Sequence, residues 1–244
     1  MKTDTAPVRN ASPHDEDKPV GASEYRSRSP LRRFARALVR FTPLRHLIFK
    51  QVRTSNPVVA LTFDDGPHPE FTPRVLDILR EHDVHATFFL IGNCARANPD
   101  LVKRIAAEGH ELANHTDAHA DLSQLSVRAA IRECRSAKRS IEEISGKRVR
   151  YLRPPWGKLS LSTLPVSFLC GMRIALWNLD SLDFRKLPPD ELVKQLRNSD
   201  PQPGDVLLFH DDGGNSVEAL PEILQELKER GLRGCAIEEM VTGR

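Results

Sequence analysis

Strand-like and helix-like segments alternate along most of this chain, and that alternation constrains the fold more than any other feature. From residue 57 onward, short apolar runs are each followed by a segment with the periodicity of an amphipathic helix. Strict alternation of this kind is typical of a parallel sheet covered by helices. Seven strands with six intervening helices therefore predict an α/β fold, namely a distorted (β/α)-barrel with about seven parallel strands.

Helix start and stop signals separate the predicted strands. Thr72 is expected to cap the first helix, with Pro73 at its first position. Asn98 is expected to cap the next helix, with Pro99 at its first position, and Gly109 is expected to end it. Strands are predicted over residues 58–63, 86–91, 111–113, 148–152, 173–177, 205–209 and 233–237, and later helices over residues 127–144 and 217–227.

The chain is expected to have three parts. Residues 1–30 are polar and charged, so they are predicted to be a disordered tail. Residues 31–53 place apolar side chains at helical spacing between arginines, which predicts a basic amphipathic helix. Such a helix would either pack on the domain or contact a membrane surface or an acidic partner. Residues 54–244 are predicted to form the α/β domain.

The distribution of charged and apolar residues limits which binding partners and which cellular locations we expect. The net charge is only +3, so nucleic-acid binding is not expected, although Arg26 to Arg53 is basic without any acidic residue. No run of about 20 apolar residues and no secretory signal is seen. The four cysteines have no metal or disulfide spacing. We therefore expect a location in the cytoplasm or at the inner membrane face, while the oligomeric state stays open.

Two adjacent carboxylates follow the first predicted strand, in the sequence TFDDGP at residues 62–67. Asp64 and Asp65 end the strand just before a Gly-Pro turn, which lets both converge on one site. Adjacent carboxylates resist joint ionisation unless a cation lies beside them. A metal ion or an arginine is therefore implied, although an acidic turn alone would explain the dipeptide equally well.

Two histidines four residues apart follow the third predicted strand. His115 and His119 can present their imidazoles to one point, and together with a carboxylate they leave open positions on zinc or a similar ion. A structural pair of histidines is the simpler alternative for this spacing alone. The position at a strand end favours a site, because it places both histidines at the same barrel end as Asp65.

Three further clusters also follow predicted strands. Arg153 and Trp156 lie in RPPWG at residues 153–157, Asp183 follows the fifth strand, and His210 follows the sixth. Solubility alone would not place Asp, His and Arg clusters at five strand ends. The sequence therefore predicts an active site at the carboxyl end of the barrel.

With these motifs in order, the chain resembles the polysaccharide deacetylase family, also called the NodB-homology family or carbohydrate esterase family 4. The resemblance covers about residues 57–237 and rests on TFDDGP at 62–67, HTDAH at 115–119, RPPWG at 153–157, DSLDF at 180–184 and LFH at 208–210. It implies that residues 54–244 are a NodB-homology deacetylase domain with a NodB-type barrel.

The resemblance also implies a role for each motif residue. Asp64 would be the catalytic base, paired with Arg153, and His210 the general acid, tuned by Asp183. Asp65, His115 and His119 would bind a divalent metal, zinc first, with cobalt or nickel as alternatives. The acetyl pocket and substrate groove would be lined by Trp156, Leu208, Pro154 and Phe184.

The expected reaction is removal of N-acetyl groups from N-acetylglucosamine-containing sugars, such as chitooligosaccharide or peptidoglycan. Deformylation or deacetylation of a lipid-linked amino sugar is the first alternative, and a carbohydrate-binding protein without turnover is the second. Phe184 stands where the family commonly has tryptophan, which bears on substrate preference more than on catalysis.

Overall fold

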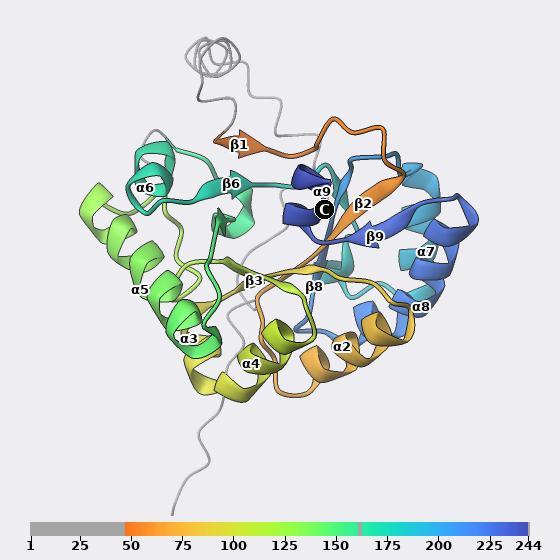
Figure 1. Cartoon of the computed structure of the whole chain (residues 1–244), viewed down its shortest axis with the longest axis horizontal. Helices are drawn as coiled ribbons and strands as arrows, with labels where there is room; N and C mark the ends of the chain where they lie inside the picture. Colours follow the sequence, from red (N-terminus) through yellow and green to blue (C-terminus); the bar gives the residue numbers. More distant parts are fainter. Residues whose placement is uncertain (1–46, 161–162, 244) are drawn as a thin grey trace, which may run out of the picture. The chain divides into compact units, whose positions relative to one another are not determined.

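A single sheet of parallel strands organises the computed structural model, which describes residues 47–160 and 163–243 (Figure 1). The long strand β2 is buried at all seven positions and pairs with β3, β8 and β9. Its apolar sequence suits a strand that is covered on both faces. The strands are β1 (Ile48–Phe49), β2 (Val58–Asp64), β3 (Thr87–Leu90), β4 (Glu111–Asn114), β5 (Tyr151–Leu152), β6 (Arg173–Ala175), β7 (Leu179–Asp180), β8 (Val206–His210) and β9 (Arg233–Cys235).

The strand order is β1-β6-β5-β4-β3-β2-β8-β7, with β9 on β2, and each ladder between named strands is parallel. The chain passes from β6 through residues 176–178 directly into β7, which pairs with β8. This segment therefore links the two ends of the strand order into a distorted barrel. The predicted fold is confirmed, with all seven predicted strands present and β1 and β7 as short additions.

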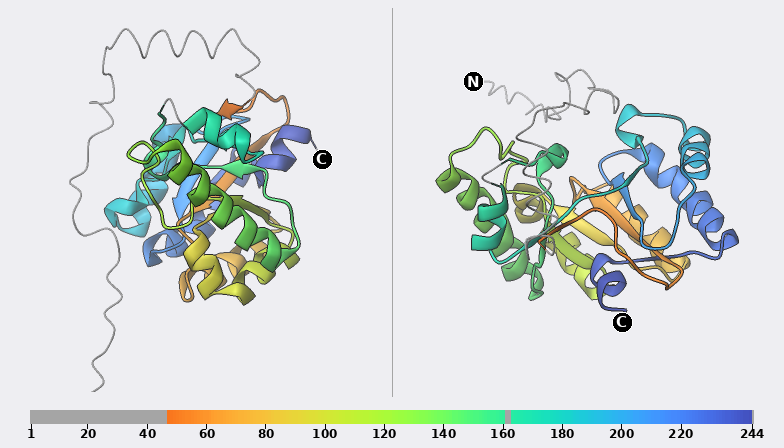
Figure 2. Two further views of the ribbon diagram at one scale, coloured as in Figure 1. Left: turned by 90° about the vertical axis from the view of Figure 1, so that its left-hand side faces the viewer. Right: turned by 90° about the horizontal axis from the view of Figure 1, so that it is seen from above.

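Helices surround the strands on the outside (Figures 1 and 2). The longest helix in the described ranges, α5, is capped at its start by Ser126, whose hydroxyl accepts from the amide of Ala129, and at its end by the left-handed Gly146. No helix in the described ranges is long and apolar enough to cross a membrane. The helices are α2 (Phe71–Glu81), α3 (Gly92–Ala97), α4 (Pro99–Ala107), α5 (Val127–Ser145), α6 (Thr163–Leu169), α7 (Pro189–Ser199), α8 (Gly214–Glu229) and α9 (Ile237–Thr242), with 3₁₀ turns η2 (Pro155–Gly157) and η3 (Asp183–Arg185).

The predicted cap at Thr72 is wrong. Helix α2 already begins at Phe71, and Thr72 lies buried in its first turn. Its hydroxyl accepts from the amide of His68 at 2.7 Å and donates to the carboxylate of Asp211. The hydroxyl therefore joins the helix to a strand end instead of capping the helix. Asn98 does precede α4 at the cap position, but its side-chain amide donates to Cys94 O at 3.1 Å and makes no hydrogen bond to the helix start.

The structure describes only the last residues of the predicted N-terminal segments. The tail over residues 1–30, and residues 31–46 of the predicted basic helix, lie outside the described residues. Within 31–53 the structure has strand β1 where a helix was predicted, because Ile48 and Phe49 pair with the free edge of β6. The sheet therefore begins before the predicted boundary at residue 54.

Helix α9 follows β9 and is held by a carboxylate at the start of β4. Glu111 Oε2 accepts from Thr87 Oγ1 at 2.8 Å and from the amide of Glu238 at 3.1 Å. Thr87 Oγ1 in turn accepts from the amide of Ile237 at 2.8 Å. Burial raises the pKa of Glu111 to about 7, because the hydrogen bonds from Thr87 and Glu238 lower this pKa by less than burial raises it.

Replacing Glu111 with glutamine is expected to flatten the pH dependence of stability. A raised folded-state pKa favours folding below the unfolded value, and this contribution is lost as pH rises from about 4.5 through about 7. One pKa unit corresponds to about 1.4 kcal/mol, and solvent screening of the partly exposed side chain reduces the effect. The parent should therefore lose about 2 kcal/mol of unfolding free energy over this pH range. Urea denaturation at pH 5 and pH 8.5 would measure it. Parallel pH curves for Glu111→Gln and the parent would contradict this account.

Candidate active site

The predicted catalytic and metal-binding residues meet at the carboxyl ends of the barrel strands. Asp64 ends β2 and His210 ends β8, and these two residues are register partners. His115 follows β4, and Arg153 follows β5. Because the strands are parallel, their carboxyl ends gather at one end of the barrel. The alternation of strands and helices thus brings motifs up to 146 residues apart into one site.

Three residues form a group that could hold a metal ion. Asp65, His115 and His119 each offer one ligand atom, and these atoms lie within 4.8 Å of one another. Asp65 Oδ1 is 3.4 Å from His115 Nε2 and 3.2 Å from His119 Nε2. One carboxylate oxygen and two imidazole nitrogens are a donor set that suits zinc, cobalt or nickel and leaves coordination positions open. The residues present therefore fit a divalent cation.

The ring of His115 is oriented by a backbone carbonyl. Its Nδ1 lies 2.8 Å from the carbonyl oxygen of Arg153, so Nδ1–H donates and Nε2 faces Asp65. Burial, followed by the neighbouring His119, lowers the pKa of His115 well below its ordinary value. The imidazole is therefore neutral, which is the form that binds metal ions.

The loop between the two histidines is held from outside the site. The amides of Asp117 and Ala118 both donate to Glu133 Oε2, at 3.1 Å and 3.0 Å. Arg96 donates to both carboxylate oxygens of Asp117, at 2.8 Å and 2.9 Å. Sequence reasoning missed Glu133 and Arg96, because nothing in the spacing of α3 or α5 points to this loop.

Asp64 is paired with a buried guanidinium. Arg153 is fully buried, and its Nη1 donates to Asp64 Oδ1 at 2.7 Å and to Thr62 Oγ1 at 2.8 Å. Its other nitrogens donate to the carbonyls of Ala175 and Leu176. Burial raises the pKa of Asp64 above its ordinary value, although Arg153 and His210 oppose the shift. The arrangement holds a carboxylate that is primed to accept a proton.

His210 is paired with a second buried carboxylate. Its Nδ1 is 2.7 Å from Asp183 Oδ1, and its amide donates to Asp183 Oδ2 at 2.7 Å. Ser216 Oγ also donates to Oδ2, at 2.6 Å. Burial lowers the pKa of His210, but the attraction and hydrogen bond to Asp183, together with attraction to Asp65 and Asp64, leave that pKa well above its ordinary value. A protonated imidazole with Nε2 available is a competent proton donor.

Asp211 is a buried neighbour of His210 to which the sequence assigned no role. It accepts from Thr72 Oγ1, and its amide donates to Asp64 O at 3.2 Å. A Cβ built at Gly66 would lie 2.3 Å from Asp211 Oδ2, so the turn after Asp65 has room only for glycine. In the sequence, only its position next to His210 pointed to Asp211. Its packing against Gly66 depends on tertiary structure, so no local pattern could predict it.

The four predicted substrate contacts divide into two exposed aromatic residues and two buried residues. The Trp156 ring lies 4.6 Å from the His119 ring, and the Phe184 ring lies 6.3 Å from the His210 ring. Both aromatic side chains are 49% exposed. Leu208 and Pro154 are buried. Leu208 lies two residues before His210 on β8, so both face the same side of the strand. Binding of substrate by these four stays a prediction.

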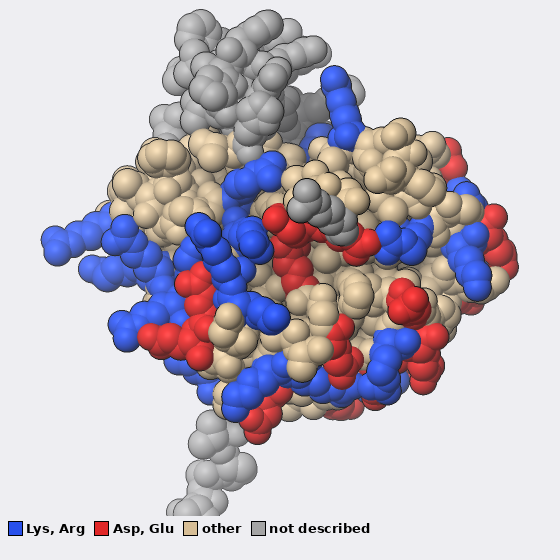
Figure 3. Space-filling view, viewed as in Figure 1, with Lys and Arg blue, Asp and Glu red and all other residues tan. Residues whose placement is uncertain are grey.

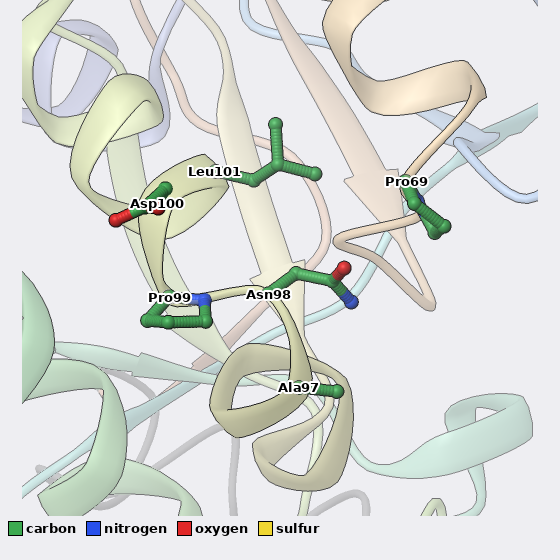
Figure 4. Close-up of a pocket in the computed structure, with 6 residues that line it drawn as sticks. All are labelled: Pro69, Ala97, Asn98, Pro99, Asp100 and Leu101. Carbon is green, nitrogen blue, oxygen red and sulfur yellow. The ribbon is translucent and has the colours of Figure 1, made fainter.

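Two pockets in the described part of the chain lie away from this cluster. One, of about 280 Å³, lies between Pro69 and the turn from α3 to α4, where Asn98 and Leu101 line it (Figure 4). The other, of about 960 Å³, opens beside the starts of β2 and β9, at the opposite ends of the strands. Neither pocket includes a predicted site residue.

Comparisons with known proteins agree with the geometry. A family model described as polysaccharide deacetylase matches residues 51–175. A chitooligosaccharide deacetylase of Sinorhizobium fredii is 38% identical over 192 residues, which are 73% of this chain and 89% of the relative. A peptidoglycan-N-acetylglucosamine deacetylase of Bacillus cereus is 36% identical over 186 residues, covering 75% of this chain and 67% of the relative.

Solved structures of the same fold include both an enzyme and a protein described as a pseudoenzyme. A crystal structure of a peptidoglycan N-acetylglucosamine deacetylase covers 83% of this chain and 98% of its own, with a TM-score of 0.77 and 32% identity. A CE4 family pseudoenzyme from Bacillus anthracis covers 80% of this chain and 69% of its own, with a TM-score of 0.76 and 28% identity. Site residues, and not the fold, must therefore decide activity.

Proposed function

The chain belongs to the polysaccharide deacetylase family, and from this we propose that it is a metal-dependent hydrolase that removes N-acetyl groups from N-acetylglucosamine-containing oligo- or polysaccharide. One observation carries the proposal. Asp65, His115 and His119 converge within 4.8 Å, and two separately paired groups, Asp64 with Arg153 and His210 with Asp183, lie at the same end of the barrel.

The metal would be held by Asp65, His115 and His119, with zinc as the first candidate and cobalt or nickel as alternatives. When bound, such an ion supplies Lewis-acid activation of water and of the amide carbonyl. Glu133 and Arg96 support the proposed metal site indirectly, because they fix the loop that presents His119. Neutral His115 supports it directly, since its Nε2 is available for coordination.

Asp64 would act as the base. Its carboxylate accepts the proton of the attacking water, and Arg153 keeps it in place by a bond to Oδ1. Its Oδ2 lies 3.8 Å from His115 Nε2, so this oxygen faces the ligand group. The second oxygen is therefore placed to take the proton.

His210 would act as the acid. Its Nδ1 is occupied by Asp183, which fixes the ring and leaves Nε2 to donate a proton to the departing amine. Proton donation matters because an unprotonated amine is a poor leaving group. Leu208, on the same side of β8, would form the wall of a small acyl pocket, with Pro154 supporting the loop opposite.

Trp156 and Phe184 would flank an extended sugar chain. Each is half-exposed, one beside the ligand group and the other beside His210. Exposed aromatic rings offer flat apolar surfaces with little conformational entropy to lose on binding. This arrangement favours an oligosaccharide that lies across the site.

The alternatives differ from the main proposal in acyl group or in turnover. Deformylation or deacetylation of a lipid-linked amino sugar would use the same site residues. A non-catalytic sugar-binding protein is the third candidate, since the fold also occurs in a pseudoenzyme. Against that candidate stands the full set of paired site residues described above.

The direct experiment incubates the full chain and added zinc with chitooligosaccharides, with peptidoglycan fragments and with N-formylated glucosamine oligomers. We expect free amine and acetate to appear in equal amounts. Formate from the formylated oligomers without acetate from the others would support the deformylase alternative. Tight sugar binding with neither product would support the binding protein and reject the hydrolase.

Replacing Asp183 with asparagine is expected to move the basic limb of the pH–activity profile to lower pH. Asp183 raises the pKa of His210, and an acid must be protonated to act. Activity is lost as pH rises through that pKa, so a lower pKa ends activity at lower pH. The profile of kcat/KM from pH 5 to 10 would measure the shift. Ser216→Ala is the matched control, because it removes one hydrogen bond to Asp183 but keeps its charge. An unchanged basic limb in Asp183→Asn would contradict the assignment of His210.

A further inference from the structure

One flank of the barrel combines exposed cations with exposed apolar side chains. It is formed by α5, α6 and β6, and we call it the α5–α6 face. Residues 127–175, which include these three elements, contain eleven Lys or Arg residues, of which Arg153 is fully buried, and only three acidic residues. By contrast, residues 180–229 contain twelve acidic and five basic residues. Charge is therefore segregated between two regions of the domain, although the net charge is small.

Arginines of α5 supply much of the positive charge on this face. Arg128, Arg132 and Arg135 are exposed, and Figure 3 shows Lys and Arg side chains gathered over the region of α5. Other cations of the helix are neutralised, since Lys138 pairs with Glu142 and Arg139 with Glu143. In the described ranges no ion pair involves Arg128, Arg132 or Arg135. These three charges are therefore available to an external anion.

Two large apolar side chains stand out at the end of α6. Phe168 is 67% exposed and Leu169 is 51% exposed. They belong to the same face as the arginines, because Arg135 Nη2 donates to the carbonyl of Leu169 at 3.2 Å. The pair thus forms a small exposed apolar patch beside a cation.

Strand β1 lies beside this face. Strand β1 pairs in parallel with β6, which directly follows α6 in the chain. Between Arg26 and Arg53 the sequence has nine Lys or Arg residues and no acidic residue. The β1–β6 pairing thus anchors the end of this stretch beside the α5–α6 face.

We propose that the α5–α6 face docks on an anionic lipid bilayer. Phe168 and Leu169 would enter the headgroup layer, while Arg128, Arg132 and Arg135 would meet lipid phosphates. Stable peripheral binding needs two signals, and apolar insertion together with basic charge supplies both. A purely polyanionic partner would use the arginines but would leave the exposed Phe168–Leu169 pair without a role.

Vesicle flotation with the full chain tests the proposal. We expect binding to vesicles of equal parts phosphatidylglycerol and phosphatidylcholine, and at least tenfold weaker binding to pure phosphatidylcholine. Arg128→Glu/Arg132→Glu and Phe168→Ser/Leu169→Ser should each weaken binding to the anionic vesicles at least tenfold. Lys194→Glu, an exposed charge reversal on α7, is the matched control and should bind like the parent.

Two outcomes would overturn the proposal. If the arginine variant loses vesicle binding but the apolar variant does not, the contact is purely electrostatic and Phe168 and Leu169 do not enter the headgroup layer. If neither variant changes binding, any lipid contact lies elsewhere in the chain. Circular dichroism and thermal unfolding of each variant establish that it is folded, since the altered side chains are exposed.

Discussion

Replacing Asp64 with asparagine is expected to lower kcat/KM for acetyl release by about 10³-fold, within the range of about 10²–10⁴ for loss of a general base. Asparagine keeps the shape of the side chain and an oxygen that can accept from Arg153 Nη1. It cannot take a proton from water at any working pH. The rate of acetate release from a chitooligosaccharide under single-turnover conditions would measure the effect.

Two controls separate loss of the base from loss of the site. Zinc affinity should change little, because Asp65, His115 and His119 are intact. Asp77→Asn, which changes a half-exposed carboxylate on α2 outside the site, should keep full activity. A kcat/KM within a few-fold of the parent for Asp64→Asn would mean that Asp64 is not the base.

Replacing Arg153 with methionine is expected to cost about 3–5 kcal/mol of unfolding free energy, the usual cost of removing one partner from a buried ion pair. Asp64 would remain buried without its counter-charge, and the carbonyls of Ala175 and Leu176 would lose their donor. Activity should fall as well, since the base loses its orientation. Urea denaturation followed by circular dichroism would measure the stability change.

A double variant tests whether the pair itself causes the loss. In Asp64→Asn/Arg153→Met neither charge is buried alone, so the second substitution should cost much less than it does in the parent. Arg132→Met, an exposed arginine on α5, is the matched control and should change stability by less than about 0.5 kcal/mol. If the stability loss of the double variant equals the sum of the losses of the two single variants, Asp64 and Arg153 are not energetically coupled and this account is contradicted.

Much of the fold and of the site followed from local rules. Apolar runs ended by turn residues located all seven predicted strands, and the parallel-barrel rule placed Asp64, His115, Arg153 and His210 together. Each of these residues ends or directly follows a strand, so its position in the sequence is enough to place it at the carboxyl end of the barrel. The Asp64–Arg153 pair does not follow from strand order, because β3 and β4 separate β2 from β5 in the sheet.

Other features depend on tertiary contacts that no local pattern encodes. Strand β1 forms at Ile48 and Phe49 because β6 offers a free edge, and two-residue strands carry no periodicity. Thr72 resembles a cap in sequence, but Asp211 engages its hydroxyl across the fold. Glu133 reaches the loop at Asp117 from the middle of a helix, where a glutamate ordinarily indicates a solvated face.

The most direct test of the central claim, a metal-dependent hydrolase of N-acetylated sugars, is acetate release before and after metal exchange. The full chain would be treated with a chelator, freed of it, and supplied separately with zinc, cobalt or nickel, with His119→Ala treated in parallel. We predict that the stripped chain releases no acetate from chitooligosaccharide, that at least one ion restores release, and that His119→Ala neither retains the ion nor recovers. Undiminished acetate release from a chain shown by elemental analysis to contain no metal would contradict the account.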